Sequence, residues 1–199
     1  MARISRRAVI ASATIVPVAA LTATAQEAGQ PASSVFSAAQ MKTLEAFIDR
    51  LIPSDETGPG ALEAGAHSYI DRQLAGYLAA EKSAFLAGLE DLDAYSRRTR
   101  AAGFAELAPA QRDEILAAMD AGRAEGFQTA RNFFNRARRL TLEGTFGDPV
   151  YGGNRNGIGW DIIRYPGPRP SVGPEQQRLD QAPTPYRQSA YGTDPEHQH

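Results

Sequence analysis

Glycine and proline are unevenly distributed in this 199-residue sequence, and the place where they concentrate limits where regular structure can form. From Gly144 onward the chain has nine of its 18 glycines and eight of its 13 prolines. Glycine loses the most conformational freedom on folding and proline has no backbone N–H to donate, so such a segment holds little regular structure. We expect residues 144–199 to be irregular, and regular elements to precede them.

Before this boundary, apolar residues recur at the three- and four-residue spacing of amphipathic helices. Ser37 and Gln40 form a capping-box pattern, and Pro53 stops the run that follows. Gly103 suits the end of a helix, and Pro109 suits the first turn of the next. No segment alternates as a strand does. The pattern predicts helices at 37–52, 62–74, 79–102, from Ala108 onward, and 127–142.

The predicted fold class is therefore all-α. We expect a small helical bundle of about five helices at 37–143, followed by the long irregular Gly/Pro-rich C-terminal segment.

The N-terminus has the pattern of an export signal. A start with three arginines (Arg3, Arg6 and Arg7) precedes a weakly apolar stretch at 8–21 and the small residues Ala23-Thr24-Ala25. Ser5-Arg6-Arg7-Ala8-Val9-Ile10 is similar to the twin-arginine pattern, although Val9 stands where phenylalanine is usual. The alternatives are a general secretory signal and a membrane helix; Pro17 and an apolar stretch shorter than about 20 residues disfavour the helix. We expect 1–25 to be a twin-arginine signal, read through Arg6 and Arg7 by the translocase, and 26–36 to be a linker.

Charge and residue types exclude several functions. Without the signal's three arginines, 18 basic residues face 23 acidic ones, a formal net charge of −5 that disfavours nucleic acid as a partner. The absence of cysteine excludes disulfides, iron–sulfur clusters and covalently attached haem. The three histidines are His67, His197 and His199, and the last two lie in a polar terminus. We expect no metal site and no bound cofactor in this chain.

The residues that catalysis requires are also scarce. His67 is the one histidine outside the terminus, so a nucleophile–histidine pair would depend on it alone. The glycine-rich segment 152–160 lacks the G-x-G-x-x-G spacing between a strand and a helix that binds dinucleotides. Its simplest interpretation is a series of turns in a surface loop. We therefore expect no catalytic residue, and an enzyme active by itself is the least favoured interpretation.

Large apolar residues are dense within 144–167, and a mobile loop would not carry so many. Trp160 and Tyr165 with the interleaved Arg164 are of the types enriched at protein interfaces. We interpret 144–167 as a docking segment that packs partly on the helices and partly on another protein.

A second docking position follows from the adjacent Phe133 and Phe134, which point about 100° apart on a helix. One is expected in the core while the other, Phe134, faces a partner. The basic group Arg131, Arg136, Arg138 and Arg139 is favoured as a solvated face over a docking surface.

Two segments in order resemble the small subunit of gluconate 2-dehydrogenase-type enzymes, the subunit 3 family. They are Leu51-Ile52-Pro53-Ser54-Asp55-Glu56-Thr57-Gly58-Pro59-Gly60-Ala61-Leu62-Glu63-Ala64-Gly65 and Phe146-Gly147-Asp148-Pro149-Val150-Tyr151-Gly152-Gly153-Asn154, continued by Gly159-Trp160 and Tyr165-Pro166-Gly167. The resemblance covers about 37–167 and leaves the tail 168–199, expected to be extended or mobile, unmatched.

The resemblance implies a large FAD-containing flavoprotein partner of the glucose-methanol-choline (GMC) class, which oxidises a sugar, sugar acid or polyol. It further implies that the complex lies in the periplasm and, as is often the case in this family, contains a multihaem cytochrome c subunit. It implies no catalytic residue here. The expected docking residues are Phe134, Tyr151, Asn154, Trp160 and Tyr165.

Export through a pathway for folded proteins also favours an escort. A cofactor-free helical domain could cross a membrane unfolded, whereas a flavoprotein must fold around its cofactor first. We therefore expect this chain to carry the flavoprotein out. The alternative is an independent exported binding protein whose C-terminal tail wraps another partner.

Overall fold

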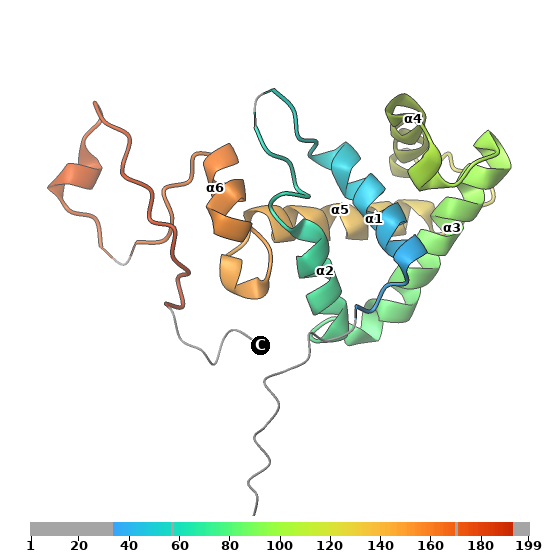
Figure 1. Ribbon diagram of the computed structural model, residues 1–199, viewed down its shortest axis with the longest axis horizontal. Coiled ribbons are helices and arrows are strands. Elements are labelled where there is room, and N and C mark those ends of the chain that lie inside the picture. Colours follow the sequence, from blue (N-terminus) through green and yellow to red (C-terminus); the bar gives the residue numbers. More distant parts are fainter. Residues whose placement is uncertain (1–33, 57, 170, 193–199) are drawn as a thin grey trace, which may run out of the picture. The chain divides into compact units, whose positions relative to one another are not determined.

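The computed structural model describes residues 34–56, 58–169 and 171–192. These residues form six α-helices and short 3₁₀ turns, with no strand among them, which confirms the all-α prediction (Figure 1). The helices are α1 (Ala38–Leu51), α2 (Ala66–Ala75), α3 (Lys82–Arg100), α4 (Pro109–Asp120), α5 (Ala130–Phe146) and α6 (Ile158–Ile162). The sixth, α6, lies in the segment that was expected to be irregular.

Helix α1 begins and ends as its sequence indicates. The Ser37 side chain accepts from the backbone N–H of Gln40, and the Gln40 side chain accepts from the N–H of Ser37, so the predicted capping box is confirmed. The helix ends at Leu51, two residues before Pro53.

The ordered chain begins ahead of the predicted boundary at Ser37. Phe36 is buried against Phe85, with ring centroids 6.1 Å apart, and the backbone N–H of Val35 donates to Asp71 at 2.8 Å. Residues 34–36, which were assigned to the linker, are thus part of the packed helical domain.

Helix α5 is the centre of the fold, because it contacts each of the other five α-helices (Figure 1). Because other helices pack on several sides of α5, more than one of its faces is buried. Phe133 and Phe134 are both 6% exposed, and both rings lie against Phe47 of α1, with centroids 6.0 and 5.8 Å away. The expectation that Phe134 faces outward is therefore wrong.

Helices α3 and α5 approach each other closely because residue 88 of α3 is glycine. A Cβ added to Gly88 of α3 would overlap with the ring of Phe133. Glycine at this position lets the aromatic ring lie directly on the α3 backbone.

Helix α3 ends before the predicted stop at Gly103. The helix stops at Arg100, where Ala101 takes a left-handed conformation with φ of 59°. Gly103 instead begins a 3₁₀ turn at Phe104–Glu106, where its N–H donates to the Glu106 carboxylate at 2.8 Å. The turn places Phe104 fully in the core, and that burial outweighs the preference for glycine in a left-handed position.

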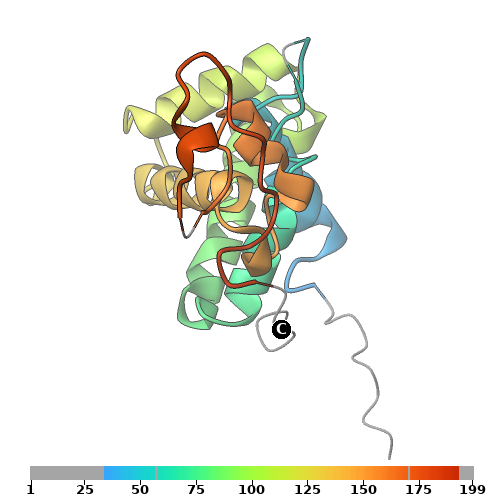
Figure 2. The same cartoon turned by 90° about the vertical axis from the view of Figure 1, so that its left-hand side faces the viewer.

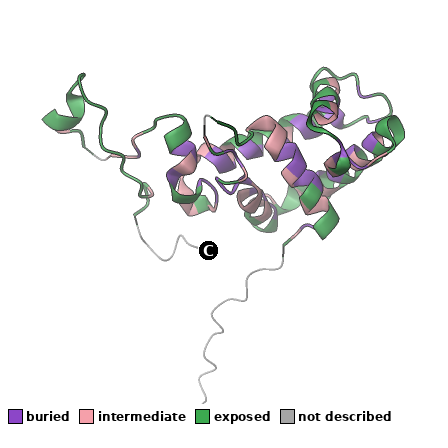
Figure 3. Ribbon diagram, turned by 45° about the horizontal axis from the view of Figure 1, so that its top comes forward, coloured by how far each residue is buried: buried purple, intermediate pink, exposed green. Residues whose placement is uncertain are grey.

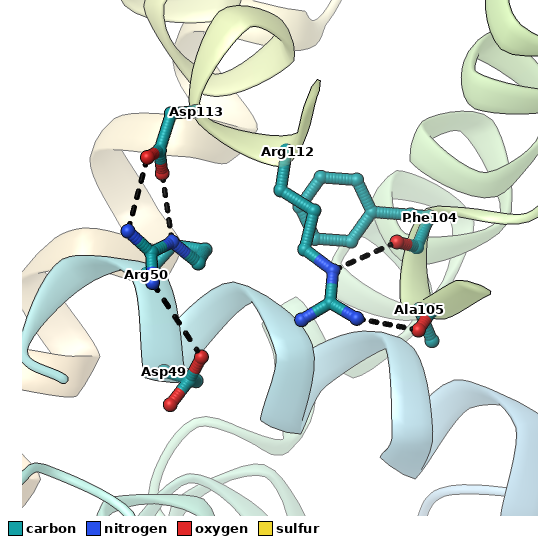
Figure 4. Close-up of polar contacts among 6 residues, drawn as sticks. All are labelled: Asp49, Arg50, Phe104, Ala105, Arg112 and Asp113. Carbon is teal, nitrogen blue, oxygen red and sulfur yellow. Dashed lines mark hydrogen bonds and ion pairs between the residues drawn. The ribbon is translucent and has the colours of Figure 1, made fainter. Parts of the chain in front are cut away.

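Helix α4 begins at Pro109, as predicted, and two arginines attach it to its surroundings (Figure 4). Arg50 of α1 donates to both oxygens of Asp113 at 2.8 and 3.0 Å, and this hydrogen bonding lowers the pKa of Asp113. Arg112 donates to the backbone carbonyls of Phe104 and Ala105 at 3.2 and 2.6 Å. Both contacts fasten α4 to elements that precede it in the chain.

Candidate partner-docking surface

The glycine-rich segment closes the C-terminal end of α5. The last carbonyls of a helix have no partner within the helix and need donors from outside. Here the Gly144 carbonyl accepts from the backbone N–H of Asn154 at 2.7 Å, and the Phe146 carbonyl accepts from Nε1 of Trp160 at 3.0 Å. The segment therefore acts as a tertiary cap on the central helix.

Asn154 is the fixed point of this cap. Its side chain is fully buried, where Nδ2 donates to the Gly147 carbonyl and Oδ1 accepts from the Gly159 N–H, both at 2.8 Å. Its φ of 43° is left-handed, a conformation that asparagine tolerates better than most residues. Asn154 thus ties both ends of the glycine-rich segment together.

Two glycines let the segment lie directly on α5. A Cβ on Gly153 would overlap with the Gly144 carbonyl, and one on Gly159 would overlap with the Thr145 carbonyl. The segment therefore packs on the helices and is not an ordinary surface loop. The glycines are needed for close backbone approach rather than for mobility.

Helix α6 continues directly from this cap. Helical periodicity does not reveal it, because it has only five residues and contains Gly159. The available signals were Ile158 and Ile162 four residues apart and Asp161 in the first turn. The helix places Trp160 in the interior, with the ring of Tyr165 edge-on against it at 5.4 Å.

Two parts of the chain that are far apart in the sequence meet here, one ending at residue 65 and the other at residue 155. The N–H of Arg155 donates to the carbonyl of Ala64 at 2.8 Å. A Cβ on Gly144 of α5 would lie 3.0 Å from the Cα of Ala66. The start of α2 and the end of α5 therefore form one junction, which the cap covers.

The five predicted docking residues divide into two groups. Tyr151 and Tyr165 are 45% and 42% exposed, and their rings also contact Tyr191 and Trp160. Phe134, Asn154 and Trp160 are buried by the chain's own residues. Asn154 and Trp160 hold the cap on the end of α5, whereas Phe134 lies against Phe47 in the helical core. A partner can contact little of these three side chains.

Exposed apolar side chains gather on and after the cap. Among the described residues, ten large apolar side chains are exposed, and all but Tyr77 and Leu142 lie in 151–191. Figure 3 shows the contrast between the buried helical core and this exposed segment. The eight are Tyr151, Ile162, Ile163, Tyr165, Val172, Leu179, Tyr186 and Tyr191. We call those within 151–165 the docking surface.

A groove of about 730 Å³ lies beside Tyr151, between α2 and α5. In it the Tyr69 hydroxyl donates to Glu143 at 3.1 Å, and burial together with this carboxylate raises the pKa of Tyr69 to about 12. Arg139 pairs with Glu143 at 2.8 Å and Arg136 with Glu81 at 2.6 Å. Two members of the basic group on α5 are thus neutralised within the chain, which favours its interpretation as a solvated face.

Several backbone N–H groups of the cap are already used within the chain. Backbone N–H groups that could hold a phosphate, those of Asn154, Arg155 and Gly159, donate to the chain's own oxygens. Within the described ranges no group of three His, Asp or Glu residues could hold a metal ion. His197 and His199 lie outside the described residues. His67 is half-buried, and this burial lowers its pKa.

The export-signal residues Arg6 and Arg7 also lie outside the described residues. In the part of the chain that the structure describes, every helix is too short or too polar to cross a membrane.

Comparison with known proteins identifies the family through the same residues that build the site. The family model for gluconate 2-dehydrogenase subunit 3 matches residues 38–167, which run from the start of α1 past the cap to the turn after α6. Searches of curated proteins and of solved structures gave no significant match. The match covers well over half of the sequence, so the chain belongs to the gluconate 2-dehydrogenase subunit 3 family and is a subunit of a dehydrogenase complex of that kind.

Proposed function

We propose that this chain is the non-catalytic small subunit that escorts and stabilises a large FAD-dependent flavoprotein of the GMC class. The large subunit oxidises a sugar, sugar acid or polyol and passes the electrons onward, to a haem c subunit where the complex has one. The observation that carries the proposal is the docking surface, where Tyr151, Ile162, Ile163 and Tyr165 stay exposed on a rigid base.

The chemistry of this surface fits a protein partner. Tyrosine and isoleucine in water lose the free energy that burial would give, about 25 cal/mol for each Å² of apolar surface. Several such groups exposed within one short segment, Tyr151 and residues 162–165, therefore favour an interaction site. Tyrosine is also enriched at interface hot spots, and the surface is held by Asn154 and Trp160, so little ordering is needed on binding.

The residue types in this chain, and the bonds that they make, support a non-catalytic role. The chain has no cysteine, and the glycine-rich cap uses its amides on α5. His67 lies half-buried near the start of α2, close enough to Arg155 of the cap to feel its charge, with no hydrogen-bond partner at Nδ1. We therefore assign oxidation to the large subunit.

The N-terminal pattern supports export of the complex to the periplasm. A flavoprotein must fold around FAD where the cofactor is available, and a twin-arginine signal on a tightly bound small subunit would carry both chains out folded. One signal then serves the complex.

The test is to change Arg6 and Arg7 together to Lys in a strain that expresses both subunits. This keeps the charge and removes the paired arginines. The expected result is that the flavoprotein, followed by its FAD fluorescence in cell fractions, stays in the cytoplasm. Arg3→Lys is the matched control and leaves export unchanged. The escort proposal fails if the flavoprotein still reaches the periplasm with the double variant.

A further inference from the structure

Residues 168–192 lie beyond the family match, yet they are fastened to the docking surface. Figure 1 shows this segment beside α6, and Figure 2 shows the same segment facing the viewer. Its contacts lie in the stretch 186–191, which holds on to the cap and the turn after α6. The chain leaves the family's fold at Gly167 and then returns to it.

Arg187 makes the strongest of these attachments. Its guanidinium pairs with Asp161 of α6 at 2.7 Å and donates to the Asn156 carbonyl at 3.2 Å. The stem of the side chain lies over Gly157, where an added Cβ would be 3.5 Å from the Arg187 Cγ. Both groups of the ion pair are about half exposed, so the pair serves to position the segment more than to stabilise the fold.

Backbone contacts on either side of Arg187 fix its direction. The Tyr186 N–H donates to the Pro166 carbonyl at 2.7 Å, and the Ala190 N–H donates to Asp148 at 2.7 Å. The hydroxyls of Tyr191 and Tyr151 lie 3.0 Å apart, with their rings edge to face at 5.9 Å. Tyr186 and Tyr191 thereby extend the aromatic surface that begins at Tyr151.

The chain between these anchors forms a loop that is closed at its base. Arg169 donates to the carbonyl of Thr184, just before the Tyr186 contact with Pro166. At the far side of the loop Leu179 is 103% exposed, between Arg178 and Asp180, which pair with each other at 2.6 Å. A loop whose ends are held and whose apolar side chain faces water has the form of a binding element.

We propose that residues 168–192 form a second docking element for the large dehydrogenase subunit, with Tyr186 and Tyr191 completing the docking surface and Leu179 entering an apolar pocket of the partner. The inference rests on the proposed function and deepens it. It assigns a specific role to a segment that the family model does not include.

The physical reason is preorganisation. A free tail of this length would lose conformational entropy when it bound, and that loss would offset the gain from burying a few side chains. Anchoring through Arg187, Tyr186 and Ala190 holds the loop before the partner arrives. Tyr191 then lies beside Tyr151 of the docking surface.

The test measures how fast the full-length subunit dissociates from its purified flavoprotein. Arg187→Ala removes the anchor, Leu179→Ser removes the proposed apolar contact, and each should speed dissociation about tenfold, which corresponds to a lost contact of about 1.4 kcal/mol. Exchanging the pair, Arg187→Asp with Asp161→Arg, should restore a rate close to wild type, whereas either change alone should not.

Arg97→Ala is the matched control, because Arg97 forms a similar exposed ion pair with Asp93 on α3, at 2.9 Å. It should leave the dissociation rate unchanged. If the wild-type complex forms and the Arg187 and Leu179 variants dissociate at its rate, this inference is overturned and the proposed function stands. If the wild-type subunit does not bind the flavoprotein at all, the proposed function itself fails.

Discussion

The indole Nε1 of Trp160 donates a 3.0 Å hydrogen bond to the backbone carbonyl of Phe146, the last residue of α5. This contact joins the docking surface to the central helix. Because a buried indole N–H and a helix-end carbonyl each need a partner, the bond satisfies two groups at once.

Trp160→Phe should destabilise the chain by about 1–3 kcal/mol, because it loses this hydrogen bond and some buried volume. The free energy of unfolding in urea measures the effect. Tyr77→Phe removes a hydroxyl from a side chain that is almost fully exposed and should change nothing. Equal stability of the Trp160 variant and wild type would contradict the assigned role of the bond.

Asn154→Ala should cost more, about 2–4 kcal/mol, since it removes two buried hydrogen bonds and places alanine in a left-handed conformation. Asn154→Gly loses the same bonds without that strain. We expect it to be more stable than the alanine variant by about 1 kcal/mol in urea unfolding. If both variants match wild type, Asn154 does not hold the cap.

Gly88→Ala should destabilise the bundle by about 1–3 kcal/mol, because the added methyl group would overlap with the ring of Phe133 in the core. Thermal unfolding measures the loss. Gly173→Ala serves as the comparison, since its backbone is extended and its added Cβ would meet only the flexible end of the Gln176 side chain. A Gly88 variant as stable as the Gly173 variant would show that α3 and α5 can move apart at little cost.

The free energy of unfolding should fall in acid because of His67. Burial holds its folded-state pKa below the ordinary 6.5, so the unfolded state takes up more protons as the pH falls. The stabilisation is therefore present above pH 6.5 and is lost as the pH falls through the lower, folded-state pKa. Free energies of unfolding between pH 7.5 and 5 measure the slope.

His67→Gln should remove that slope. A variant with glutamine at both His197 and His199 should keep it, which separates the half-buried histidine from those near the end of the chain. The prediction fails if the two variants show the same dependence on pH.

Substitutions at Phe134 and Ile163 should distinguish a residue of the core from a residue of the docking surface. Phe134→Ala removes a buried ring and should cost about 3–5 kcal/mol of stability. Ile163→Ser changes an exposed side chain and should stay within about 0.5 kcal/mol of wild type. In the complex, Ile163→Ser should instead speed dissociation from the flavoprotein. A large loss of stability for Ile163→Ser would mean that it belongs to the core.

The sequence by itself determined five of the six helices that the structure describes, and some of their boundaries. The capping box at Ser37, the stop before Pro53 and the start at Pro109 depend on neighbouring residues only, and each is found as predicted. The family was also evident from local segments, because their residues are consecutive in the chain.

Only the tertiary structure decided which residues face outward. Phe134 is buried because α5 has neighbours on several sides, and Gly153 and Gly159 serve close packing because the end of α5 lies against them. Asn154 and Trp160 bond to carbonyls of Gly147 and Phe146, and Arg187 pairs with Asp161, 26 residues away. Periodicity describes one element at a time, whereas burial and hydrogen bonding depend on residues that only the folded chain brings together.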